Sequence, residues 1–194
     1  MRISRGWVSV ITVLFSMATG SIALGQADHV RWDIISLAFT TPPTVSAGGI
    51  AFASANATLT IKLTGSGTFV APASGGTSGA ATGGGTWETF VSDVSTGSGT
   101  YSVASLSSWQ FANFQPPVNN DLIGPVGRGA NGNAILRIEY SDGSKGVLGV
   151  GCHGPGAPAG IQEGVIATKD FVTYWTAQHP APGVDANRTS FHVQ

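Results

Sequence analysis

The sequence predicts an all-β fold: an antiparallel up-and-down β-barrel or a strongly curved β-sandwich, of about eight to ten strands, with one short helix near the C-terminus. Three observations favour this class. Several segments alternate apolar and polar residues as half-buried strands do, a hairpin signal separates two of them, and a glycine–aromatic motif occurs three times. A barrel is favoured over a sandwich because strands are expected at both ends of the mature chain, where they can pair and close it.

The composition limits the classes of function. The chain has 194 residues, of which 42% are hydrophobic and 10% charged, and its formal net charge is -1. This balance argues against global disorder. The small number of Lys and Arg residues argues against a nucleic-acid partner, because phosphate binding needs basic side chains.

Residues 1–27 have the pattern of a signal peptide. Two arginines precede an uncharged apolar stretch, residues 6–18, and small residues beyond it offer cleavage sites. The alternative is a retained membrane anchor, because the uncharged run of residues 6–27 is long enough to cross a bilayer. We expect cleavage, a secreted or periplasmic protein without a stable membrane span, and a single β domain over residues 28–194.

Four segments outside both the repeated motif and the hairpin described next predict strands. Residues 57–63 alternate almost perfectly, with the leucines and the isoleucine on one face. Residues 30–39 are rich in aromatic and β-branched side chains and end before two prolines, and residues 50–55 form a second short candidate. Residues 191–193 predict the strand that closes the fold.

An Asp-Gly pair at residues 142–143 predicts a tight hairpin turn. It separates two strand-like segments, residues 134–140 and 145–150. If this pair alone forms the turn, Ile138 faces Val147.

Residues 168–175 predict the one short helix. Thr168 can cap it, Asp170 lies in its first turn, and Phe171 and Trp175 form an aromatic pair four residues apart. Two later prolines end it. Its aromatic stripe is expected to pack against the sheet or to close a barrel mouth.

The motif T-G-(S/G)-G-T-aromatic occurs at residues 64–69, 82–87 and 96–101, with starts 18 and then 14 residues apart. Unequal spacing argues against a solenoid and favours successive antiparallel strands joined by loops of different length. Each aromatic residue shares a strand face with two preceding glycines, and we expect that face to point inward. In architecture alone, such strands resemble those of small up-and-down barrels of the lipocalin kind, and architecture does not give function.

The predicted register places each ring over a glycine of the neighbouring strand. It assumes a three-residue loop at residues 92–94. The predicted pairs are Trp87 with Gly99, Tyr101 with Gly85, Phe69 with Gly83 and Trp87 with Gly65. The glycines then either let the sheet curve or leave room on its concave side for an apolar ligand.

The leading functional prediction is a non-catalytic binding module that holds a small, largely apolar ligand near Phe69, Trp87 and Tyr101. The alternative is an extracellular interaction protein that acts through two long loops, residues 74–80 and 115–132. Oligomeric state is not predicted by any pattern in the chain.

A third class is an enzyme with a site at Cys152, His153 and Glu163, because a thiol beside an imidazole is a candidate nucleophile. It ranks last, since consecutive strand residues point to opposite faces and His153 cannot easily activate Cys152. We expect this lone Cys to be a buried structural thiol. No cofactor and no metal site are expected, because the candidate ligands lack the usual spacings. These candidates are His29, Asp33, His153, Glu163, His179, Asp185 and His192.

Overall fold

The computed structural model describes residues 27–72, 76–117, 120–125, 128–177 and 186–194. Within these residues it contains strands and no helix, and its fourteen strands form one sheet. The predicted signal peptide lies outside the described residues except for its last residue. Across the described part of the chain, there is no helix of the length and apolar character needed to span a membrane.

The strands are β1 (Asp28–Ala38), β2 (Thr44–Ala47), β3 (Ala51–Ser54), β4 (Leu59–Leu63), β5 (Ser66–Ala71), β6 (Ala81–Val91), β7 (Val94–Phe114), β8 (Asn120–Asp121), β9 (Gly129–Tyr140), β10 (Lys145–Cys152), β11 (Gly164–Lys169), β12 (Val172–Tyr174), β13 (Thr176–Ala177) and β14 (Arg188–Val193).

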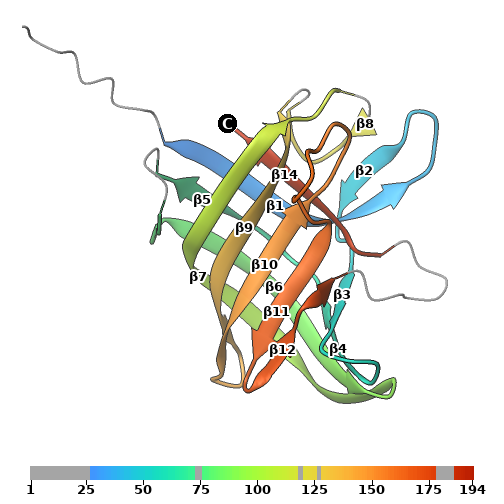
Figure 1. The fold of residues 1–194 in the computed structure, drawn as a ribbon, viewed down its shortest axis with the longest axis vertical. Helices are drawn as coiled ribbons and strands as arrows, with labels where there is room; N and C mark the ends of the chain where they lie inside the picture. The colour runs from blue at the N-terminus through green and yellow to red at the C-terminus, as the bar shows by residue number, and fades with distance from the viewer. Residues whose placement is uncertain (1–26, 73–75, 118–119, 126–127, 178–185) are drawn as a thin grey trace, which may run out of the picture.

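Six strands close into an antiparallel barrel in the order β1, β5, β6, β7, β9, β14 and back to β1 (Figure 1). Closure by the terminal strands is confirmed, because Trp32 of β1 faces Phe191 of β14. Strands β5, β6 and β7 are consecutive in the chain. Strand β14, in contrast, pairs with β9 although four strands lie between them in sequence.

The other strands extend the sheet beyond the barrel. Strands β10, β11 and β12 continue from β9, and strands β4, β3 and β13 continue from β6. Strand β2 pairs with β1, and β8 pairs with β2. The first two extensions meet, because β11 contacts β3 and β13. Strands β9, β10 and β11 therefore form a broad curved surface with β7, which Figure 1 presents to the viewer.

The glycine–aromatic motifs lie on adjacent strands, and the register predicted for the second and third copies is confirmed. Trp87 faces Gly99 and Tyr101 faces Gly85. The turn differs from the prediction: residues 92–93 alone form it, both with positive φ, and a β-bulge next to it restores the register.

The register predicted for the first copy is wrong by two residues. Phe69 faces Ala81, and Trp87 faces Leu63 instead of Gly65. The reason is that β4 and β5 run along β6 in one common register, although β4 also pairs with β3 and β5 with β1. Because strand faces repeat every two residues, the shift leaves Phe69 pointing into the core.

The register predicted for the β9–β10 hairpin is wrong by one residue. Residues 141–143 form a three-residue loop, since the Tyr140 N–H donates to the Ser144 carbonyl oxygen. Ile138 consequently faces Gly146, one residue before its predicted partner. A shift by one residue exchanges the two faces of β10.

The helix predicted at residues 168–175 is wrong: strands β11 and β12 form a hairpin there. Lys169 pairs with Val172, which leaves Asp170, at φ 53°, and Phe171 as a two-residue turn. The β-branched residues on both sides of this turn favour strands over a helix. Phe171 is fully exposed and Trp175 is 69% exposed, so these two rings do not pack against the sheet as predicted.

Candidate functional site

The three rings predicted to bind a ligand are all buried. Phe69, Trp87 and Tyr101 are 1%, 5% and 4% exposed and belong to one core cluster. Phe69 packs edge to face with Trp109, with ring centroids 5.4 Å apart, whereas Trp87 packs in the same way with Tyr140 at 5.7 Å. Phe69 thus makes its closest ring contacts in a different part of the core from Trp87. Ligand binding at these three rings stays a prediction.

Of the predicted ring–glycine contacts, that of Trp87 with Gly99 is confirmed, whereas backbone atoms of Thr64 and Ser66 fill the space beside Gly85 and Gly83. A Cβ atom on Gly99 would lie 3.0 Å from the indole nitrogen of Trp87, and one on Gly97 would lie 3.4 Å from the same indole. The Tyr101 hydroxyl passes over Gly65 and donates a hydrogen bond of 2.8 Å to the Thr64 carbonyl oxygen. Aromatic side chains therefore replace the missing glycine side chains in this part of the sheet.

Trp87 also lines a cavity of about 410 Å³. Beside it lies the buried ammonium of Lys169, which is 4.4 Å from the Trp87 ring centroid and 4.9 Å from that of Tyr140. Lys169 forms ion pairs with Asp142 and Asp170, and its hydrogen bond holds the pKa of Asp142 at about 2. A buried cation next to Trp87 disfavours a purely apolar ligand in this cavity.

The three candidate catalytic residues come together around a smaller cavity of about 230 Å³. Glu163 accepts hydrogen bonds from the backbone N–H groups of His153 and Thr189, and burial raises the pKa of its carboxyl group. The His153 imidazole, through Nδ1, lies 2.8 Å from the Ile161 carbonyl oxygen. Glu163 therefore connects the end of β10 to β14, and the imidazole is engaged by the backbone.

The Cys152 thiol is buried. Burial, reinforced by the nearby Glu163 carboxylate, raises the pKa of this thiol to about 12. The Gln115 side-chain amide donates a hydrogen bond of 3.2 Å to the sulfur atom. Because the thiolate is the reactive form, the geometry agrees better with a structural thiol than with a catalytic one.

We expect Cys152 to react with iodoacetamide at pH 8 at least about tenfold more slowly in the native protein than in urea, because burial suppresses the thiolate and blocks access. Intact-mass spectrometry over a time course measures both rates. The unfolded protein serves as the control for intrinsic thiol reactivity. Equal rates in the two conditions would contradict a buried, protonated thiol.

A buried polar cluster, which the sequence patterns did not predict, lies under the predicted loop of residues 115–132. The His192 side chain is fully buried, and its Nε2 atom lies 2.7 Å from Asp121 Oδ2. Asp121 also accepts hydrogen bonds from the backbone N–H groups of Ile123 and Gly124. Burial raises the pKa of Asp121, but these hydrogen bonds outweigh it and lower the pKa overall. The cluster fixes this part of the loop to β14; partner binding by the loop stays a prediction.

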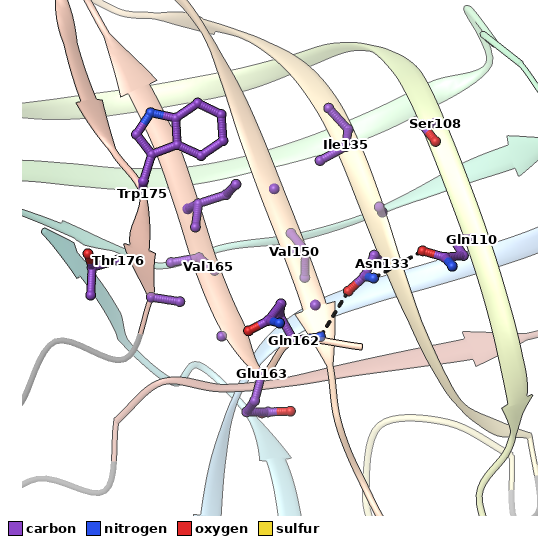
Figure 2. Close-up of a pocket in the computed structure, with 16 residues that line it drawn as sticks. Ser108, Gln110, Asn133, Ile135, Val150, Gln162, Glu163, Val165, Trp175 and Thr176 are labelled. Atoms are coloured by element: carbon purple, nitrogen blue, oxygen red, sulfur yellow. Dashed lines mark hydrogen bonds between the residues drawn. The ribbon is translucent and has the colours of Figure 1, made fainter. Parts of the chain in front are cut away.

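A groove of about 790 Å³ lies on the outer face of β7, β9, β10 and β11 (Figure 2). Strand β10 forms the floor of the groove, and it has no side chains at two of its positions there, Gly149 and Gly151. A Cβ atom at Gly149 would lie 2.5 Å from Ile166 and 3.3 Å from Ile135. The two isoleucines therefore lean over β10 from the strands on either side and form an apolar floor.

Polar groups and one indole ring border this floor. Figure 2 shows Trp175 and Thr176 on one side of the groove and Gln110 and Asn133 on the other. Asn133 donates a hydrogen bond of 3.2 Å to the Gln110 side-chain oxygen and accepts one of 3.3 Å from the Gln162 backbone N–H. Trp175 lies where the chain leaves β12 to form β13, which pairs with β3. This change of direction places the indole beside the groove.

The groove is almost uncharged. Among its described lining residues, Glu163 carries the one ionisable side chain. Both of its oxygens accept backbone N–H groups. The groove can therefore supply an apolar floor, an exposed indole and side-chain amides.

Sequence patterns did not identify this groove. The paired glycines of β10, Gly149 and Gly151, were a visible signal, but the predicted hairpin register placed them on the inner face. Trp175 was assigned to a helix.

No group of three or more His, Cys, Asp or Glu side chains is arranged to hold a metal ion in the described part of the chain, and His179 and Asp185 lie outside that part. Comparisons of the chain with protein-family models, curated proteins and solved structures find no match.

Proposed function

We propose that the protein is an exported, non-catalytic binding module that holds a small, partly apolar ligand in the groove over β7, β9, β10 and β11. The observation that carries this proposal is the exposed indole of Trp175 beside a groove of about 790 Å³. Ligand pockets commonly measure about 300–1,000 Å³. Trp is enriched at binding interfaces because its indole combines a large apolar surface with a polar N–H group. The predicted signal peptide supports export.

The character of the lining supports binding over catalysis. Ile135 and Ile166 provide apolar contact area, and the amides of Gln110 and Asn133 can orient a ligand. Glu163 is engaged by two backbone N–H groups, which limits its capacity to act as a general base. The proposal retains the small-ligand function predicted from the sequence and moves the ligand from the interior to the outer face.

Titration with N-phenyl-1-naphthylamine, a neutral apolar fluorophore, tests the proposal. We expect a saturable rise in its emission with the unmodified protein, and roughly two- to tenfold weaker binding to Trp175→Ala because the stacking surface is lost. Phe171→Ala is the matched control, since Phe171 is an exposed aromatic residue that does not line the groove. Equal binding to the two variants would contradict the proposal.

A further inference from the structure

We infer that the ligand of the groove is a neutral saccharide, whose ring stacks on Trp175 and whose hydroxyl groups pair with the side-chain amides across the groove. This inference rests on the proposed function and names the ligand class of the same groove. Three properties carry it: the lack of charge, the row of amides, and the exposed indole beside an apolar floor.

The lack of charge favours a neutral ligand. No Lys, Arg or His is present among the described residues that line the groove. An anionic ligand would find no cationic partner there, and burying an unpaired charge is costly. Glu163 is the one carboxyl group, and both its oxygens already accept backbone N–H groups. A cationic ligand would find only the remaining lone pairs of this single carboxyl group.

The row of amides favours hydroxyl groups. Asn133 and Gln110 are joined by one hydrogen bond, which uses the Gln110 oxygen and leaves its two N–H donors available. An amide can both donate and accept, as can a hydroxyl group, so amide side chains pair with polyols without charge. A purely apolar ligand would cover these amides without giving them partners, which lowers affinity.

The indole and the floor favour a ring with an apolar face. Trp175 offers a flat apolar surface at one side of the groove, and Ile135 and Ile166 continue the apolar surface over β10. A pyranose ring has C–H groups on its faces and hydroxyl groups at its rim. It can therefore contact the indole and the isoleucines while its rim reaches Gln110 and Asn133.

The floor strand of the groove disfavours a peptide that would bind as an added strand. Peptides that bind β-sheets commonly add a strand to a free edge. The floor strand β10 is paired with β9 on one side and with β11 on the other. The floor strand β10 thus has no free edge for an added strand, and over this strand side chains must provide the recognition.

Isothermal titration of the purified protein with cellohexaose, maltohexaose and chitohexaose tests the inference, with an oligogalacturonate as the charged comparison. We expect at least one of the three neutral oligosaccharides to bind the unmodified protein and Phe171→Ala equally. Binding to Trp175→Ala should be at least about tenfold weaker, and binding to Gln110→Ala should also be weaker. The Gln110 side chain is exposed, so its removal leaves the core unchanged. Thermal melts of each variant check the fold.

Two negative outcomes are distinguishable. If none of the three neutral oligosaccharides binds but N-phenyl-1-naphthylamine binds in a manner that depends on Trp175, the saccharide inference fails and the proposed function stands. If neither kind of probe binds, both fail. Tighter binding of the oligogalacturonate than of the neutral oligosaccharides would also overturn the inference, because it would require a positive charge that the lining lacks.

Discussion

Replacing Gly83 with alanine is expected to destabilise the protein by roughly 2–6 kcal/mol. Gly83 lies on β6 opposite Gly67 of β5 and has φ +110°, a conformation that other residues rarely adopt. A Cβ atom there would collide with the Ser66 carbonyl oxygen and lie 2.5 Å from the Gly67 Cα atom. Backbone atoms cannot turn away as a flexible side chain can, so overpacking adds to the conformational strain.

Two other glycines separate these contributions. Gly76 has φ +100° and no atom near its missing Cβ. Gly76→Ala should therefore lower the free energy of unfolding by about 1–3 kcal/mol, through backbone strain alone. Gly79 has neither a positive φ nor a close neighbour, and Gly79→Ala should change stability by less than about 0.5 kcal/mol. Urea unfolding followed by circular dichroism measures all three. Equal stabilities of Gly83→Ala and Gly79→Ala would contradict the close approach of β5 and β6.

Phe191→Ala is expected to lower the free energy of unfolding by about 3–5 kcal/mol. Phe191 lies on β14, the strand that closes the barrel between β1 and β9, and its side chain is fully buried. Its ring centroid is 4.7 Å from that of Trp109 and 6.5 Å from that of Phe69. Truncation removes these edge-to-face contacts and leaves a cavity that the rigid strands can only partly fill.

Phe171→Ala provides the control for Phe191→Ala. It removes the same side chain from a fully exposed turn, and a change within about 0.5 kcal/mol is expected. Urea unfolding monitored by tryptophan emission compares the two variants. A comparable loss for both would show that Phe191 does not sit in a closed core, because an exposed ring has little buried area to lose.

The sequence could predict which faces of the strands point inward, because alternation is a local property. The segment around Leu59 to Leu63 forms β4, with Ile61 and Leu63 fully buried. The three motif rings are buried for the same reason, even though the pairing of Phe69 differs by two residues from the prediction. An even shift preserves the face of a strand, so this mistake did not alter the core.

The groove could not be predicted because an odd shift exchanges the faces. The Asp-Gly signal near Gly143 was identified, but it did not distinguish a two-residue from a three-residue loop. That single residue decides that Gly149 and Gly151 lie on the outer face while Cys152 points inward. Loop length is set by how the flanking strands pair with their other neighbours, which is not a local property.

The prediction that Trp175 packs against the sheet from a helix is wrong for a similar reason. The spacing of Trp175 from Phe171 fits a helix face, whereas the chain turns at Asp170. The β-branched residues on both sides were the available signal for a hairpin. The convergence of Cys152, His153 and Glu163, in contrast, required β10, β11 and the connection between them to be in place.

The central claim is that ligands bind on the outer face of the sheet, beside Trp175, and not among the buried rings. Amide NMR spectra of the ¹⁵N-labelled protein titrated with N-phenyl-1-naphthylamine test it most directly. The backbone signals of Gly149, Gly151 and Gly164 and the indole signal of Trp175 should shift together and saturate. Shifts centred on the backbone signals of the strands that carry Phe69, Trp87 and Tyr101, with those of β10 unchanged, would contradict the claim.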